Sequence, residues 1–351
     1  MDALPVPAAQ TSPARTSSAY VQPKAAWRVM LGAEDLTAKL GPLLISLSLS
    51  EKDGEEADQL QLTIDDSKGN VAIPPEGATL QVWLGWERGT EVTTGLIFKG
   101  SFKVDEAGYS SPPSRITLTA RSADLAESFR TRRNRTWSDG TLGDIVGVIA
   151  QEHGIEPRCH PDLAATAIKV AEQAGKSDMQ FLRDLGRRYD ASAVVKAGAL
   201  IFAPKGAPTT AGGNTIPEAV LVRSRCSQID WKRAARDRAQ DGAEAQWHDK
   251  HEAKRKTHST GGNNRKRLKR TYANEADAKA AAEAETKRLK RAAATLSASL
   301  AWGNPLLSPG VRVTATGFKS EIDRTPWLIS SAEHSMDASG LKTRIEMEVA
   351  A

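Results

Sequence analysis

The sequence predicts a mixed but mainly β protein, with two small antiparallel β-barrel domains and a helix-and-hairpin α/β module between them. Three observations predict it. Apolar and polar residues alternate with a period of two near both ends of the chain, which is typical of half-buried strands. Two central stretches show the spacing of amphipathic helices instead. Turn signals rich in Gly, Pro, Asn and Asp separate the short strands, as in compact barrels and sandwiches.

The first β region follows a stretch rich in Pro, Ala, Ser and Thr that we interpret as a flexible N-terminal arm, not a secretion signal. Ile45, Leu47 and Leu49 alternate with serines, and a similar run covers residues 60–65. Further strands are expected at 79–86, 92–98, 102–105 and 116–120. Trp83 and Trp86 are three positions apart and therefore point to opposite faces of one strand. An exposed Trp there is a candidate subunit contact.

The central module contains two helix starts of the same kind. Thr141 with Asp144, and Ser177 with Gln180, have capping-box spacing, which satisfies the free amides of a first helical turn. Apolar residues follow each cap at helical spacing. A strand pair at 194–195 and 200–202, with a turn between, then predicts a short hairpin.

The second β region begins after a Gly- and Thr-rich linker at 206–214. Strands are expected at 220–222, 227–231, 311–316, 327–334 and 341–349. Residues 232–270 are highly polar and are interpreted as a long excursion or disordered loop. Asn274 and Asp277 predict the start of an Ala-rich helix that continues to about Leu300.

These patterns divide the chain into four parts: the arm (1–26), the first barrel (27–125), the module (126–205) and the second barrel (206–351). The polar loop and the long helix form an insertion at about 232–300. No apolar run approaches the ~20 residues of a membrane span. Two cysteines, Cys159 and Cys226, give neither a disulfide framework nor a metal quartet, and we interpret both as free thiols.

Basic residues gather in two places, although the formal net charge is only +5. The first group is Arg130, Arg132, Arg133 and Arg135, and the second extends over residues 254–270. Such patches either remain solvated or meet the phosphates of DNA.

The sequence predicts no catalytic, cofactor-binding or metal-binding residues. His248, His251 and His258 lie near Asp249 and Glu252, but without the i, i+4 spacing of a zinc helix. Adjacent residues such as Cys159 and His160 rarely form a nucleophile and its base. His153 is interpreted only as a favourable charge at a helix end. The carboxylate pairs 55–56 and 65–66 are placed in turns.

One segment resembles a known family. The Ser177-Asp178 step followed by Phe181 and Leu182, Tyr189, and the hairpin with Gly198, Leu200 and Phe202 are similar to the phage late-control D family. These are tail hub proteins of contractile phage tails; the resemblance extends more distantly to the N-terminal part of VgrG spikes. It covers roughly residues 27–349.

The resemblance implies a structural protein and no enzyme. It implies a homotrimer whose two similar barrels per chain make a pseudo-six-fold ring between the six-fold tail tube and the trimeric spike. Implied partners are the spike, the tube or tube-initiator protein, and further wedge and tape measure proteins. DNA would only pass through the lumen, no membrane insertion is expected, and the protein would reside in the virion baseplate after assembly in the host cytoplasm.

Two other hypotheses stay open. A nucleic-acid-binding protein would use the two basic patches and show salt-sensitive DNA binding. A VgrG-like spike component of a secretion system, or an enzyme acting on peptidoglycan, would need a catalytic constellation or an additional domain. The native mass of the chain and its DNA binding discriminate between these hypotheses.

Overall fold

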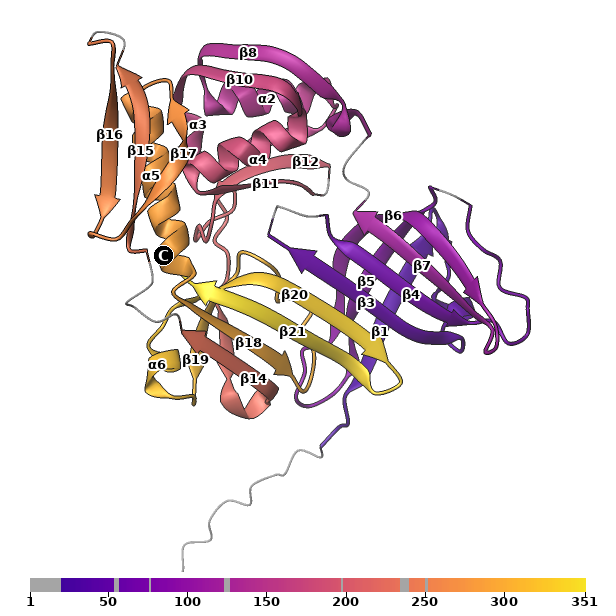
Figure 1. Ribbon diagram of the computed structural model, residues 1–351. Helices are drawn as coiled ribbons and strands as arrows, with labels where there is room; N and C mark the ends of the chain where they lie inside the picture. Colours follow the sequence, from indigo (N-terminus) through magenta and orange to yellow (C-terminus); the bar gives the residue numbers. More distant parts are fainter. Residues whose placement is uncertain are drawn as a thin grey trace, which may run out of the picture.

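The computed structural model describes residues 20–53, 57–75, 77–122, 127–196, 198–233, 240–249 and 252–351 (Figure 1). Strands dominate, so the prediction of a mainly β protein is confirmed. The expected arm lies mostly outside these residues, and its last residues already belong to the first strand, which begins at Lys24. No helix in the described part of the chain is long and apolar enough to cross a membrane.

The first β region contains the predicted alternating strands. They are β1 (Lys24–Leu31), β2 (Glu34–Asp35), β3 (Leu44–Lys52), β4 (Gln59–Asp65), β5 (Thr79–Arg88), β6 (Gly95–Ser110) and β7 (Arg115–Ser122), with the short helix α1 (Thr37–Leu40). The inward residues of β3 and β4, such as Leu47, Leu49, Leu60 and Leu62, are almost fully buried in one apolar core. The period of two therefore correctly predicts the buried face at Leu47 and Leu49, whereas Ile45, at the irregularity between Leu44 and Ser46, is 37% exposed.

The central module places two helices against short sheets. Its elements are η1 (Glu127–Arg130), β8 (Arg132–Thr141), α2 (Leu142–Glu152), β9 (Glu156–Cys159), α3 (Pro161–Ala164), β10 (Ala167–Ser177), α4 (Asp178–Tyr189), β11 (Ala191–Lys196) and β12 (Ala199–Pro204). Both predicted helix caps are confirmed: Thr141 forms a capping box with Asp144, and the Ser177 hydroxyl accepts from the Gln180 amide. β8, which carries most of the first basic group, was not predicted.

The second β region contains a set of secondary-structure elements similar to that of the first. It contains β13 (Ala219–Val222), η2 (Arg223–Arg225), β14 (Cys226–Arg233), β18 (Ala294–Leu300), β19 (Arg312–Thr316), α6 (Ser320–Asp323), β20 (Trp327–Asp337) and β21 (Gly340–Val349). Trp327 is fully buried in the core of this region. Each β region thus contributes at least six strands and a four-residue helix.

The insertion contradicts two predictions. Residues 242–272 do not form a disordered loop; they form the sheet β16–β15–β17, from β15 (Gly242–Asp249), β16 (Lys254–Gly261) and β17 (Arg265–Tyr272). In the described part of the chain, only one face of this sheet is covered, by α5 (Glu275–Arg291), where Ala243 and Ala245 pack on Ala278 and Ala282. A core of alanines leaves little apolar signal in a polar sequence, which explains the error.

The Ala-rich helix is also shorter than predicted. α5 ends at Arg291, and the residues up to Leu300 form β18. Leu296 and Ala298 are buried at alternate positions in the second core, so strand periodicity already replaces helical periodicity there.

One long sheet connects the two β regions. Its strand order is β14-β18-β21-β20-β3-β4-β7-β6-β5-β1-β2, with β19 paired to β20 and β13 paired to β19. The antiparallel pair β3–β20 makes the connection, with Leu49 opposite His334. No pairing among the described residues joins the two ends of this path, so the division into two closed barrels stays a prediction.

Candidate functional site

The module is built around the buried carboxylate of Asp178, the first residue of α4. The carboxylate accepts hydrogen bonds from Gln173 Nε2 at 2.7 Å and His153 Nε2 at 2.9 Å, and it pairs with Arg135. Burial tends to raise the pKa of Asp178, but the three donors outweigh it and hold the pKa below its usual value. Asp178 therefore remains charged and ties α4 to β8, β10 and the end of α2.

His153 has a larger role than the predicted one at a helix end. It caps the C-terminus of α2, but its ring also stacks on Phe129, with 3.6 Å between ring centroids. Its Nδ1 lies 2.7 Å from the Ser128 hydroxyl. Because Nε2 faces the acceptor-only carboxylate of Asp178, Nε2 donates to that carboxylate.

Two members of the first basic group are paired with carboxylates. Arg133 Nη1 lies 2.7 Å from Glu152 Oε2, and the Arg135 guanidinium contacts the carboxylates of both Glu152 and Asp178. The Arg135 guanidinium also lies over the Trp137 ring, 4.7 Å from its centroid. These arginines hold the module together, so they form a weaker DNA-binding patch than the sequence indicated.

The Asp178 network yields a stability prediction. Asp178→Asn keeps the shape but opposes the donors with an NH₂ group, so we expect a loss of about 3 kcal/mol in the free energy of unfolding, measured with urea. The control Asp162→Asn removes a carboxylate that is 77% exposed, and should change stability by less than about 0.5 kcal/mol. Equal effects of the two substitutions would contradict the network's role.

A second buried charge lies where the two β regions meet. Glu51 on β3 is 1% exposed, and its Oε2 lies 2.5 Å from Nζ of Lys99 on β6. The same oxygen lies 3.2 Å from Nε2 of His334 on β20. Lys99 Nζ also donates to the carbonyl of Pro305 at 3.0 Å, and Nδ1 of His334 lies 2.9 Å from the Thr343 hydroxyl. We call Glu51, Lys99, His334 and Thr343 the junction cluster.

The charge states of the junction cluster follow from these contacts. Burial raises the pKa of Glu51, but the His334 hydrogen bond and the charges of Lys99 and Lys196 bring it to about 2. Burial lowers the pKa of His334, and Glu51 offsets this only in part. His334 is therefore neutral at pH 7, with Nε2 donating to Glu51 and to the Leu307 carbonyl at 3.1 Å.

A bulge in β6 helps to place Lys99. Across β5, Trp83 pairs with Phe98 and Val82 with Gly100, so Lys99 is the extra residue between them. A bulge of this kind re-aims a side chain. It allows a lysine to turn inward from a strand whose neighbouring Phe98 is 46% exposed.

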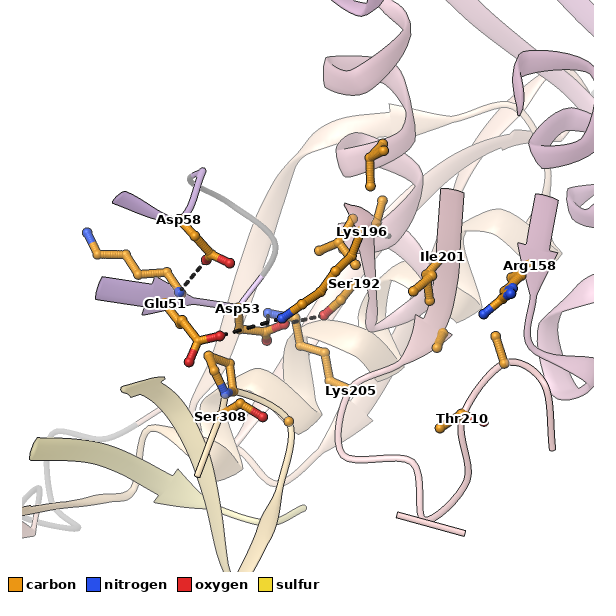
Figure 2. Close-up of a pocket in the computed structure, with 18 of the residues that line it drawn as sticks. Glu51, Asp53, Asp58, Arg158, Ser192, Lys196, Ile201, Lys205, Thr210 and Ser308 are labelled. Carbon is orange, nitrogen blue, oxygen red and sulfur yellow. Dashed lines mark hydrogen bonds and ion pairs between the residues drawn. The ribbon is translucent and has the colours of Figure 1, made fainter. Parts of the chain in front are cut away.

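The central module reaches the same junction. Ser192 on β11 donates to Asp53 at 2.5 Å, and Lys205 pairs with that carboxylate at 2.9 Å. Figure 2 shows Ser192 and Lys196 extending from β11 toward Asp53 and Glu51. A cavity of about 470 Å³ lies between these elements. Burial raises the pKa of Asp58 on its wall to about 6.

His334 makes stability depend on pH. Because its folded pKa lies below the unfolded value of about 6.5, the unfolded chain binds more protons below pH 6.5 and the folded state is penalised there. We expect the stability advantage of the wild type over His334→Gln to fall by up to about 2 kcal/mol between pH 7.5 and pH 5. Asp58 acts in the opposite sense, but both proteins share it, so its effect cancels. A constant difference across these pH values would contradict the buried neutral state.

A third ionic contact fixes α5 to the module and to the second β region. Arg291, at the end of α5, forms a bidentate ion pair with Asp190, the residue that caps the C-terminus of α4. Its Nε also lies 3.0 Å from Glu348 on β21. At the other end of α5, Asp277 accepts from the Tyr189 hydroxyl at 3.2 Å. The insertion is therefore attached at both ends of its helix.

The sequence-derived metal candidates are not brought together. His248 lies on the exposed face of β15, whereas His258 lies opposite Ala245, on the face that packs on α5. His251 lies outside the described residues, as does the pair 55–56. Within the described part of the chain, no cluster of three His, Cys, Asp or Glu residues could hold a metal ion.

Cys159 and His160 make separate contacts. Burial raises the pKa of the Cys159 thiol to about 11, which disfavours a reactive thiolate. His160 lies at the start of α3, and its ring accepts from the Asp162 amide at 3.3 Å and contacts the Thr209 hydroxyl at 3.0 Å. The pair does not act together.

The two tryptophans of β5 lie on opposite faces, as predicted. Trp86 is buried, and its Nε1 donates to the Gly303 carbonyl at 2.8 Å, across the two β regions. Trp83 is half-buried on the other face, where it packs on the exposed Phe98 with 4.9 Å between ring centroids. Leu96, also exposed, is on the same strand as Phe98. We call Trp83, Leu96 and Phe98 the outer apolar patch.

The sequence interpretation missed the junction cluster, although a signal was present. Glu51 continues the inward series of Leu47 and Leu49, and His334 lies between the inward residues Ala332 and Met336. A charged or titratable residue at a core position of a strand indicates a buried polar partner. The partner itself depends on the tertiary pairing of β3 with β20.

Comparisons with known proteins agree with this architecture. Residues 59–340 match the family model described as phage tail baseplate hub (GPD). The chain is 32% identical over 366 residues to a probable baseplate hub protein of Escherichia phage 186, with 92% of each chain covered. A tail protein from Neisseria meningitidis MC58 has a similar fold, with a TM-score of 0.66, 13% identity, and coverage of 92% of this chain and 96% of that one.

A more distant likeness extends beyond phages. A type VI secretion component of E. coli, c3393, described as structurally similar to the T4 tail proteins gp27 and gp5, has a TM-score of 0.55 at 14% identity. The match covers 88% of this chain and 74% of that one. The fold is thus shared by tail proteins and tail-like systems. The chain belongs to the phage tail baseplate hub family, which confirms the resemblance read from the sequence.

Proposed function

We propose that this chain is a structural hub that forms a homotrimer, in which three copies of two similar β units make a pseudo-six-fold ring. The observation that carries the proposal is the duplicated architecture: two β regions of similar inventory share one sheet through β3 and β20. Family membership supports the same role. Three chains with two equivalent units each match the six-fold symmetry of a tail tube on one side and a trimeric spike on the other.

The assignment of parts follows the sequence-based division. We propose that residues 27–125 and 206–351 supply the two barrel-like units, and that 126–205 forms the side that receives the spike. Assembly would occur in the host cytoplasm and end in the virion baseplate, with tube, wedge and tape measure proteins as further partners. We assign no catalytic role to the hub, and we expect DNA to pass through the lumen of the ring.

The native mass of the chain, alone and co-expressed with its spike protein, tests this function. We expect three times the chain mass of 37.7 kDa, or a three-to-three complex with the spike. A monomer that stays a monomer in the presence of the spike would overturn the proposal. Analytical ultracentrifugation distinguishes these outcomes.

The outer apolar patch is our candidate for the contact between subunits. Its large apolar side chains at the surface of β5 and β6, two of them aromatic and in contact, fit the anchors of protein interfaces. We expect the double substitution Trp83→Ser and Phe98→Ser to weaken trimerisation by about 30-fold or more in the dissociation constant. The two rings pack on each other and act as one interface anchor, and an anchor contributes about 2 kcal/mol or more.

Tyr109→Ser serves as the control, because Tyr109 is 58% exposed near the other end of the same strand. It should leave the mass distribution unchanged at every protein concentration. Trimers that tolerate the double substitution but dissociate in the control would place the interface elsewhere on β6.

A further inference from the structure

The insertion sheet has one strongly basic face that no other part of the described chain covers. α5 packs on the opposite face, where Thr260 of β16 bonds to the Ala282 carbonyl and to Thr286. Figure 1 shows the sheet at the margin of the molecule, beyond α5. By strand alternation, the free face carries Arg255, Arg265 and Arg267, and the exposed Lys269 adjoins them. We call these four residues the basic face.

The cations of the two faces differ in their partners. On the helix side, Lys256 pairs with Asp249 and Glu252 at 2.6 Å, and Lys266 pairs with Glu285 at 2.7 Å. On the basic face, Arg267 lies 3.6 Å from Glu244. Arg255, Arg265 and Lys269 have no carboxylate partner among the described residues. The basic face therefore keeps an uncompensated positive charge.

The remaining residues of this face are small or polar. Gln246, His248, Thr257, Ser259 and Thr271 supply amide, imidazole and hydroxyl groups. Trp247 and Tyr272 lie on the helix side or pack with its core. Protein interfaces depend on apolar and aromatic anchors. Binding of single-stranded nucleic acids depends on aromatic side chains on which the bases stack. The described part of this face offers neither, but it does offer donors and positive charge for a polyanion.

We propose that the basic face binds the phosphate backbone of duplex DNA without sequence preference. From Arg265 to Lys269 β17 advances about 13 Å, a length over which a duplex carries about eight phosphate charges. The four cations are spread over β16 and β17, so each can reach a different phosphate. No helix enters a groove, so the contact positions the duplex but does not read its bases.

Fluorescence anisotropy with a labelled 30-base-pair duplex tests the proposal on the full chain. Four phosphate contacts predict a slope of about −3.6 for the logarithm of affinity against the logarithm of salt concentration, or a loss of about 150-fold between 50 and 200 mM salt. Two duplexes of different sequence should bind equally, and a single strand more weakly.

Two matched variants distinguish the contribution of the basic face to DNA binding from that of net charge. The face variant carries R255Q, R265Q, R267Q and K269Q; the control variant carries K68Q, K169Q, R324Q and K342Q, all exposed elsewhere. Both lower the formal net charge of +5 by the same amount. We expect the face variant to lose the salt-dependent binding and the control to keep it. If the fourfold variant does not fold, the single substitutions R255Q and R265Q replace it. Each is expected to lower the magnitude of the slope of log affinity against log salt concentration by about 0.9.

Three results would overturn the proposal. Absence of duplex binding at 50 mM salt would show that the face is only solvated, and equal losses in the two variants would show that net charge alone matters. Displacement of the duplex by poly-glutamate of equal charge at equal concentration would assign the face to an acidic protein partner instead. None of these results bears on trimerisation, which is measured separately.

Discussion

The arrangement of the whole chain depends on the burial of one carboxylate, that of Glu51. A charge taken out of water must be paired and hydrogen-bonded, because an unpaired buried ion costs several kcal/mol. Lys99 and His334 satisfy Glu51, and they come from strands on the two sides of the junction. The pair β3–β20 can therefore form only in the register that brings these groups together. Asp53, two residues further along, adds the contacts to Ser192 and Lys205 of the module.

The module shows why the family's sequence signature combines these particular residues. Ser177 caps α4, Asp178 holds Arg135 and His153, and Phe181 and Leu182 fill the core beneath. One helical turn thus supplies a helix start, a buried ionic centre and apolar packing. Basic residues have two kinds of surroundings in this chain. Arg135 and Arg291 pair with carboxylates and fix elements to each other, whereas Arg255, Arg265 and Lys269 of the basic face have no carboxylate partner among the described residues.

Much of the fold could be predicted from the sequence where one local rule dominates. Alternation identified β3 and β4, and cap spacing identified the starts of α2 and α4. The insertion was mispredicted because its core consists of alanines such as Ala243 and Ala278, whose burial depends on α5 packing close. The junction cluster could not be assembled from sequence, since Glu51 and His334 lie 283 residues apart and meet only through β3–β20 pairing.

Hydrogen exchange of the Glu51→Gln variant, followed by mass spectrometry, tests most directly whether this junction unites the chain. The substitution leaves Lys99 buried without its counter-charge and weakens the bond to His334. We expect faster amide exchange in β3, β20 and β11 together, because all three elements meet at this point. Faster exchange confined to β3, with β20 and β11 unchanged from the wild type, would contradict it.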